Sequence, residues 1–226
     1  MSRLGRILIL AEMHGRDLIR RHAALGLLIA LPLSFYLASA GSGGAVSSGG
    51  VGMAFAVSGA ALFSVLSSRE VDQRLVLAGY RPVEMLFGRL VFLGPLGLVI
   101  GGGFSLLMAL MSGPARPWVM ALGVSAVALQ SVAVGLAVGA VVPLELEGTL
   151  VLIGVIGVQL AAELHSVVSK ALPFYGPRRL IGSSLNAHGP VGGPLLQTAA
   201  YGVGLLVVTR IFVSRRVDIA RHDLLD

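Results

Sequence analysis

Cysteine is missing from the sequence, and charged residues are scarce. None of the 226 residues is a cysteine, which excludes disulfides, thiolate chemistry and cysteine-based metal sites. Only 12% of the residues are charged, whereas ordinary soluble domains contain about 25%. A water-soluble fold needs more polar residues than this to cover its surface. The composition therefore indicates a protein whose solvent is the lipid bilayer.

Motifs for nucleotide and metal chemistry are missing as well. The sequence contains no GxxxxGK[ST] loop to hold the phosphates of a nucleotide, and no HExxH or comparable metal-ligand spacing. The net charge of +6 is not accompanied by a basic stripe interleaved with aromatic residues. We therefore expect anionic lipid headgroups as partners and no nucleic acid. We also expect no catalytic residue, metal or cofactor on this chain, so an energy source would have to come from a partner.

Six apolar segments are each close to the roughly 20 residues that a helix needs to cross about 30 Å of hydrocarbon. Barrel strands would be shorter and would alternate in polarity, so helices are favoured. The sequence thus predicts an all-α integral membrane protein, with residues 1–226 forming a single transmembrane domain. The predicted spans are Ala23 to Ala40, Val51 to Ser67, Met85 to Met111, Trp118 to Val142, Gly148 to Val168 and Pro194 to Val213.

The arginines predict the orientation of these spans, because basic residues in short flanks stay on the cytoplasmic side. If both termini are cytoplasmic, 13 of the 17 basic residues lie inside and four lie outside. We therefore expect both termini in the cytoplasm. The inner set is Arg3, Arg6, Arg16, Arg20, Arg21, Arg69, Arg74, Arg81, Arg89, Arg210, Arg215, Arg216 and Arg221, and the outer set is Arg116, Lys170, Arg178 and Arg179.

Residues 3–22, before the first span, are amphipathic. Apolar residues such as Leu4, Ile7 and Leu8 recur at helical spacing, while arginines supply a charged side. This pattern predicts a helix that lies at the membrane interface, with its apolar face at the headgroup boundary. A short continuation of the first span is the alternative.

Residues 68–84, between the second and third spans, mix charged and apolar residues at near-helical spacing. Gly79 followed by Pro82 is a helix stop. The spacing predicts a short helix with Arg69, Asp72 and Arg74 facing water, while Val71, Leu75 and Ala78 face the membrane domain. A solvated loop whose arginines serve as topological anchors is the alternative.

The whole layout resembles the permease subunits of type-2 ABC exporters. Those proteins have an amphipathic N-terminal helix, six spans, a charged first cytoplasmic loop and a long last outer loop. Their first loop is similar to E-R-E-x-G-T-L-E-x-L-x-x-x-P, and it forms the coupling helix that docks on the ATPase. This sequence departs from that pattern by placing Gln73 and Arg74 where Gly-Thr is frequent, and it lacks the glutamate that usually follows. The matching positions are Arg69, Glu70, Leu75, Leu77 and Pro82.

The resemblance implies a subunit that forms half of an export pathway. A second permease, of the same or a homologous chain, would complete the pathway. Two cytosolic ABC ATPase subunits would supply the energy, with ATP and Mg bound to those partners. The Arg-, Ala-, Gly- and Val-rich composition is typical of a GC-rich bacterial genome, so we expect a bacterial plasma membrane. The coupling residues implied are Arg69, Glu70, Asp72, Gln73, Arg74, Gly79 and Tyr80.

Residues 170–194 form the expected outer loop, which is broken by proline and glycine. The resemblance implies short re-entrant helices here that form a gate before the last span. Backbone of this kind can dip into the interface only where protein shields it. A simple surface loop is the alternative.

Four polar residues within or near the spans are candidates for the translocation pathway, because such groups tend to face a bundle interior or a watery cavity. They are Gln130, Gln159, Glu163 and His165. Glu163 and His165 do not share a helix face, so they are not expected to act as one acid-base pair. Interhelical hydrogen bonding by the two glutamines, and solvation of Glu163, are the alternatives.

Two other functions fit parts of the sequence. An intramembrane hydrolase or transferase would use His165 or His188 with a serine such as Ser183, although GxSxG spacing is absent. An ion-coupled carrier would titrate Glu163, and internal repeats would favour it, but no convincing repeat is present.

Overall fold

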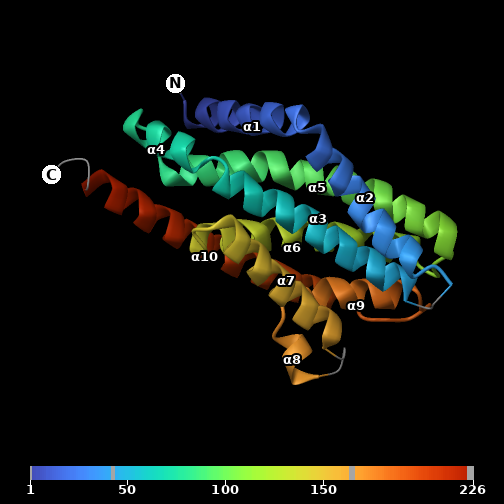
Figure 1. Cartoon of the computed structure of the whole chain (residues 1–226). Coiled ribbons are helices and arrows are strands. Elements are labelled where there is room, and N and C mark those ends of the chain that lie inside the picture. The colour runs from blue at the N-terminus through green and yellow to red at the C-terminus, as the bar shows by residue number, and fades with distance from the viewer. Residues whose placement is uncertain (1, 42–43, 163–165, 223–226) are drawn as a thin grey trace.

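The computed structural model describes residues 2–41, 44–162 and 166–222, with side chains as far as Arg215. Every regular element in these ranges is a helix, which confirms the all-α prediction. Figure 1 shows a bundle of long helices with shorter ones at its margins. The helices are α1 (Arg3–Arg20), α2 (His22–Ala38), α3 (Ala45–Leu66), α4 (Arg69–Leu77), α5 (Pro82–Ser112), α6 (Pro117–Val141), α7 (Glu145–Ala161), α8 (Val167–Lys170), α9 (Tyr175–Ser184) and α10 (Gly192–His222).

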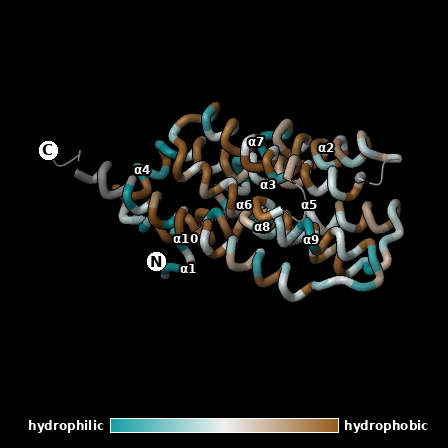
Figure 2. The backbone as a smooth tube through the Cα atoms, turned by 90° about the horizontal axis from the view of Figure 1, so that it is seen from below, coloured by the Kyte–Doolittle hydropathy of each residue, from teal (hydrophilic) through white to brown (hydrophobic). Residues whose placement is uncertain are grey.

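The predicted apolar segments overlap α2, α3, α5, α6, α7 and α10, but α7 ends at Ala161, before the predicted end of the fifth span at Val168. Four described helices, α3, α5, α6 and α10, are long and apolar enough to cross a membrane, and α1 with α2 would make a fifth as one bent span. Helix α7 has 17 residues and reaches about 26 Å, slightly short of the hydrocarbon core. A multi-pass membrane protein is therefore indicated, and the number of six spans and the side of the termini stay predictions. In Figure 2 hydrophobic residues run along the bundle, while α4 is hydrophilic.

A sharp bend separates α1 from α2. Ser2 caps the start of α1 by accepting a hydrogen bond from the Gly5 backbone N–H at 3.2 Å. The chain then breaks at Arg21, and the axes of α1 and α2 differ by 81°. A straight helix through both segments is therefore excluded, and a continuation of the first span as one bent span stays the alternative. The interfacial position of α1 agrees with this bend but stays a prediction.

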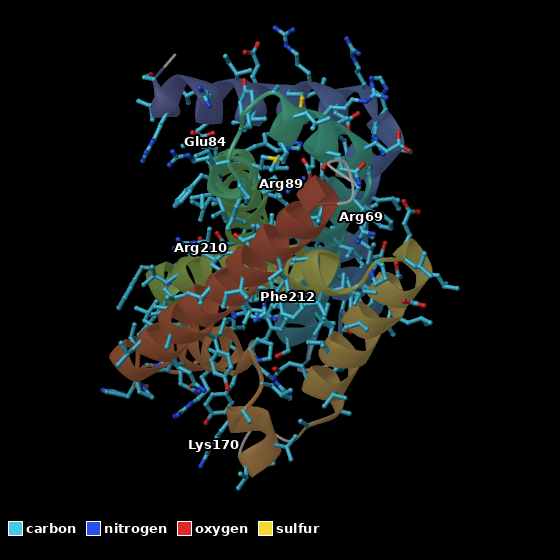
Figure 3. All side chains as sticks on the ribbon, turned by 90° about the vertical axis from the view of Figure 1, so that its left-hand side faces the viewer. Arg69, Glu84, Arg89, Lys170, Arg210 and Phe212 are labelled. Carbon is cyan, nitrogen blue, oxygen red and sulfur yellow. The ribbon has the colours of Figure 1, made fainter. Side chains whose placement is uncertain are left out.

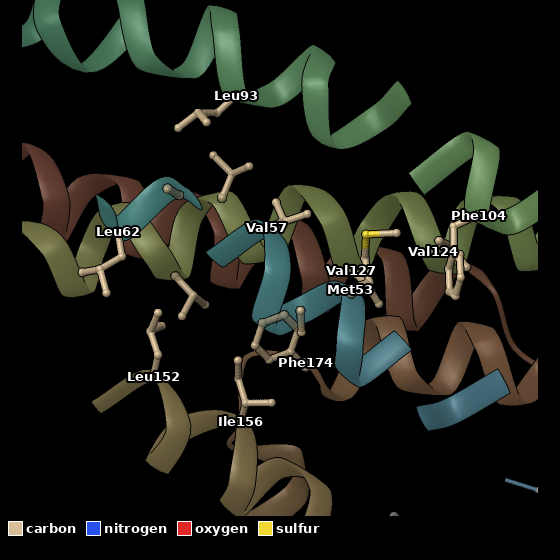
Figure 4. Close-up of a cluster of buried hydrophobic side chains, with 14 of the residues drawn as sticks. Met53, Val57, Leu62, Leu93, Phe104, Val124, Val127, Leu152, Ile156 and Phe174 are labelled. Carbon is tan, nitrogen blue, oxygen red and sulfur yellow. The ribbon is translucent and has the colours of Figure 1, made fainter. Parts of the chain in front are cut away.

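Helices α3 and α6 form the centre of the bundle. Their most apolar stretches are 67% and 83% buried, against 6% for α10, so α10 is peripheral. Gly135 of α6, which has GxxxG spacing to Gly139, lies at the crossing of these two helices, where an added Cβ would lie 2.2 Å from the Ser58 carbonyl oxygen of α3. The surrounding core, shown in Figure 4, contains Met53, Val57 and Leu62 of α3, Leu93 and Phe104 of α5, Val124 and Val127 of α6, Leu152 and Ile156 of α7, and Phe174.

The segment 170–194 is not a simple surface loop. Helix α9 packs against α6 and α10, and Leu180 and Ser184 on it are fully buried. The Arg116 backbone N–H donates to the Ser184 carbonyl at 3.0 Å, which joins the end of α9 to the start of α6. Protein therefore shields α9, as a re-entrant segment requires, whereas the irregular residues 185–188 after it are exposed. Its depth in the membrane stays a prediction.

Candidate coupling helix and membrane cleft

Helix α4 closes one end of the bundle and lies beneath α1. Figure 3 looks along the bundle from this end, with α1 lying across it above Glu84, Arg89 and Arg69. The helix stops where Gly79 adopts a φ of +85°. The Tyr80 N–H then donates to the Leu75 carbonyl and the Gly79 N–H to the Val76 carbonyl, both at 3.0 Å. This is a Schellman motif, so the helix stop predicted at Gly79 is confirmed.

Arg69 joins the start of α4 to the end of α6. Its Nη2 donates to the carbonyls of Val142 at 2.7 Å and Gly139 at 3.3 Å, and its Nη1 donates to the Pro143 carbonyl. The last carbonyls of a helix have no partner within the helix and carry a partial negative charge. A guanidinium is well suited to them, since it presents several donors in one plane. Arg69 therefore caps α6.

Arg89 of α5 joins the bundle to the middle of α4. Its side chain is 2% exposed, and its Nη2 donates to both Asp72 Oδ2 and Ser68 Oγ at 2.5 Å. Burial raises the pKa of Asp72, while the charges of Arg89 and Arg69 act against this shift. Because an arginine stays charged, Asp72 is the partner that makes burial of Arg89 tolerable.

These contacts correct the predicted orientation of α4. Arg69 and Asp72 turn toward the bundle and are only partly exposed, because their partners are the end of α6 and Arg89. Val71, predicted to face the membrane domain, is 41% exposed and borders a cleft, and Ala78 is exposed. The exposure of Arg74 is confirmed.

The outer face of α4 carries a stripe that we call the docking stripe. Its four residues are exposed, and their spacing of three and four places them on one side of the helix. Leu77 is 69% exposed, which is high for a large apolar side chain. The stripe thus combines both signs of charge with an apolar end. It consists of Glu70, Gln73, Arg74 and Leu77.

Helix α1 holds the turn after α4. Arg6 donates from Nη1 to the Gly79 carbonyl at 3.0 Å and lies 5.4 Å from the ring centroid of Tyr80. Its Nη1 is also 3.7 Å from the buried carboxylate of Glu84. Glu84 in turn accepts from the Arg81 backbone N–H at 2.9 Å and so caps α5. Gly79 and Tyr80 are thus held by α1, whereas the docking stripe is free of these contacts.

A cleft of about 810 Å³ lies between α1, α2, α3, α5 and α7. Its floor is formed by residues of α3 from Phe55 onward and by Ser67 and Ser68 after α3, and α2 and α7 contribute to its walls. Its lining is apolar along most of its length and polar where α1 and the end of α3 meet. Val71 of α4 borders this polar end.

His14 of α1 lines the polar end of the cleft. Burial, with a smaller effect from the Arg89 guanidinium, lowers the pKa of His14 to about 4, against the opposing charge of Asp17. The imidazole is therefore neutral at pH 7. It adds a hydrogen-bonding group to the cleft without adding a charge.

Acidification should destabilise the protein through His14. The imidazole takes up a proton near pH 6.5 when unfolded and near pH 4 when folded, so its contribution is complete above pH 6.5 and is lost as the pH falls toward 4. Allowing for partial exposure, we expect a loss of about 1–3 kcal/mol. Thermal unfolding in detergent, followed by fluorescence of Trp118, measures it. The pH dependence should be smaller in His14→Gln, and identical curves would contradict the assignment.

The two described pathway candidates, Gln159 and Gln130, do not line the same cavity. Gln159 accepts the Phe174 N–H at 3.2 Å through Oε1 and lines a cavity of about 50 Å³ between α3, α6, α7 and α9. Gln130 is 2% exposed on α6, and its Nε2 has no hydrogen-bond partner among the described residues. Neither glutamine is among the residues that line the large cleft. Glu163 and His165 lie outside the described residues, so their roles stay predictions.

Of the residues named for a hydrolase, Ser183 and His188 are described, and His165 lies outside the described residues. Ser183 is buried, and its hydroxyl donates to the Leu180 carbonyl at 2.9 Å, whereas His188 is exposed. Within residues 2–41, 44–162 and 166–222, no group of three or more His, Cys, Asp or Glu is arranged to hold a metal ion.

Sequence reasoning missed two structural arginines and the cleft. Arg89 was counted as a topological anchor, although it is 1% exposed. Arg178 donates from Nη1 to the carbonyls of Gln159 at 2.9 Å and Ala162 at 2.8 Å, and so closes the end of α7. The pairing of Arg89 with Asp72 follows no local spacing in the sequence. Arg178, in contrast, follows two prolines and a glycine, a sign of a turn at a helix end.

Comparisons with known proteins do not assign this chain to a family. No family model matches the sequence, and a search of curated proteins gave no significant match.

Proposed function

We propose that this chain is the membrane-spanning permease subunit of an ATP-driven ABC exporter. One observation carries the proposal: α4 is a short surface helix that exposes a mixed docking stripe while its other face is tied to two long helices. Arg69 ties it to α6, and the pair of Asp72 with Arg89 ties it to α5. A force on the stripe would therefore move the bundle and would not merely bend a loop.

The proposed partners follow from this arrangement. The docking stripe would bind a cytosolic ABC ATPase, present in two copies, which would carry ATP and Mg. A second permease subunit would complete the pathway, and the peripheral faces of α7 and α10 leave room for it and for lipid. The positive-inside bias supports a cytoplasmic position for α4 and both termini, which we propose lie in a bacterial cell. Export by rigid-body motion of the two halves would then follow ATP hydrolysis.

Reversing the docking stripe should remove the ATPase without unfolding the permease. In the variant Arg74→Glu with Leu77→Asp, a lost charge contact and a lost apolar contact together should cost about 2 kcal/mol or more, or roughly 30-fold in affinity. Arg69 is left intact because its loss would uncap α6. The measurement is the amount of P-loop ATPase, by mass spectrometry and hydrolysis rate, that co-purifies with the tagged chain from native membranes.

Lys170→Glu is the matched control, because this exposed cation lies beside the first turns of α10 and away from α4. It should retain the ATPase at wild-type level. Equal recovery of the ATPase with the folded stripe variant would show that α4 is not the docking site. ATP hydrolysis by the purified chain alone would contradict the proposal that a separate partner chain hydrolyses ATP.

A further inference from the structure

We propose that the cleft over α3 binds a lipid-like amphiphile, with its apolar body along α2 and α3 and a neutral or zwitterionic head beside α1. Binding is argued from the cleft itself. The further step, that this occupant is the class of molecule transported, rests on the proposed function.

The apolar part of the cleft has the size and lining of a ligand site. Its volume of about 810 Å³ lies within the range of pockets that enclose a drug-sized ligand. Small residues, Ala56, Gly59 and Ala60, hollow the floor on α3, and larger side chains stand at its sides. Leu27 of α2 and Phe63 of α3 are 59% and 43% exposed although they line the cleft. These surfaces are complementary to hydrocarbon.

The polar end selects for a head without net charge. Asp17 and Arg21 form an ion pair of 3.2 Å there, so their charges cancel, and His14 is neutral. A purely anionic head would approach the Asp17 carboxylate, and a purely cationic head would approach the Arg21 guanidinium. A zwitterion or an uncharged hydrogen-bonding head can satisfy both.

Two serines add acceptors at the same end. The hydroxyls of Ser64 and Ser67 donate to the carbonyls of Ala61 at 2.8 Å and Phe63 at 2.7 Å in their own helix. Their oxygens keep lone pairs that can accept a hydrogen bond from a ligand. Polar groups are thus gathered at one end of an otherwise apolar cleft. This gradient matches an amphiphile that stands along the bundle with its head at the level of α1.

The occupant would also touch the coupling helix. Ser68 and Val71 border the polar end of the cleft, and the Ser68 hydroxyl accepts the hydrogen bond from Arg89. A head bound here would therefore lie against the contacts that fix α4. In an exporter, this places the occupied cleft next to the surface on which the ATPase acts.

Filling the cleft tests the proposal. The full-length protein is placed in nanodiscs of phosphatidylcholine that contain a phosphatidylcholine probe with a diazirine in its acyl chain, and labelled peptides are located by mass spectrometry after photolysis. An added Cβ at Gly59 meets nothing within 4 Å, and Gly59 lines the cleft, so Gly59→Phe adds a ring there without a clash at its Cβ. Gly103→Phe is the matched control, because it lies exposed on α5 with nothing within 4 Å.

The wild-type protein and Gly103→Phe should be labelled on α2 and α3 at least five-fold more than on the exposed face of α5. Gly59→Phe should lose that preference. If the phenylalanine variant does not fold, Gly59→Leu serves as a smaller replacement. Uniform labelling, or labelling unchanged by either substitution at Gly59, would overturn the proposal. So would efficient oxidative cross-linking of two chains through Gly59→Cys, which would show that a second copy fills the cleft.

These outcomes are independent of ATP. Cleft labelling without co-purification of an ATPase would support the amphiphile site and contradict the exporter proposal. Co-purification without cleft labelling would support the exporter proposal and contradict the amphiphile site.

Discussion

Asp72→Ala should lower the free energy of unfolding by about 3–5 kcal/mol, the usual cost of leaving a buried charge without its partner. The substitution leaves the Arg89 guanidinium 2% exposed with Ser68 as its remaining side-chain partner among the described contacts. The Arg89 guanidinium cannot avoid being a buried charge by losing its proton, because arginine stays protonated in proteins. The loss of Asp72 should therefore cost far more than an exposed ion pair would.

A double-mutant cycle separates the pair from its surroundings. Arg89→Met should cost less, because Asp72 is 21% exposed and can be solvated, and Arg89→Met with Asp72→Ala should recover part of the loss of Asp72→Ala alone. Reversible unfolding in mixed detergent micelles gives the four free energies. Additive effects of the two substitutions would mean that this pair does not hold α4.

Gly135→Ala should destabilise the bundle by about 3 kcal/mol, although alanine is the better helix former by about 1 kcal/mol. An added Cβ would lie 2.2 Å from the Ser58 carbonyl oxygen and 2.7 Å from the Ala61 Cβ. A Cβ cannot move away by rotation of a side chain, and its nearest neighbour is backbone. The crossing of α3 and α6 would therefore have to open, at the centre of the core.

Gly154→Ala on α7 is the control for helix propensity, because a Cβ there meets no atom within 4 Å. It should be neutral or stabilising by up to about 1 kcal/mol. Thermal unfolding of both variants in the same detergent measures the difference. Equal midpoints for the two would show that α3 and α6 do not approach as closely as described.

The helices themselves were predictable because their signals are local. Long apolar runs identify the helices of the bundle, and the stop of α4 follows from Gly79 and Pro82. Gly135 and Gly139 have the GxxxG spacing typical of close helix packing, and both glycines face α3. Each of these features depends on residues within a few turns of one another.

The roles of the arginines were not predictable in the same way. Arg69, Arg74 and Arg89 look alike in the sequence as positive flanks of spans. The structure makes Arg69 a cap and buries Arg89, and it leaves Arg74 exposed on the docking stripe. The partners of Arg69 lie 70 to 74 residues further along the chain, beyond any local pattern.

By itself, the sequence determined that the chain is helical and suited to a membrane, because hydropathy and helix stops are properties of neighbouring residues. Only the tertiary structure decided which face of α4 is open and that a cleft forms over α3. Those features depend on how distant helices approach, since a hydrogen bond to a helix end or an unfilled space between helices exists only once the bundle has assembled.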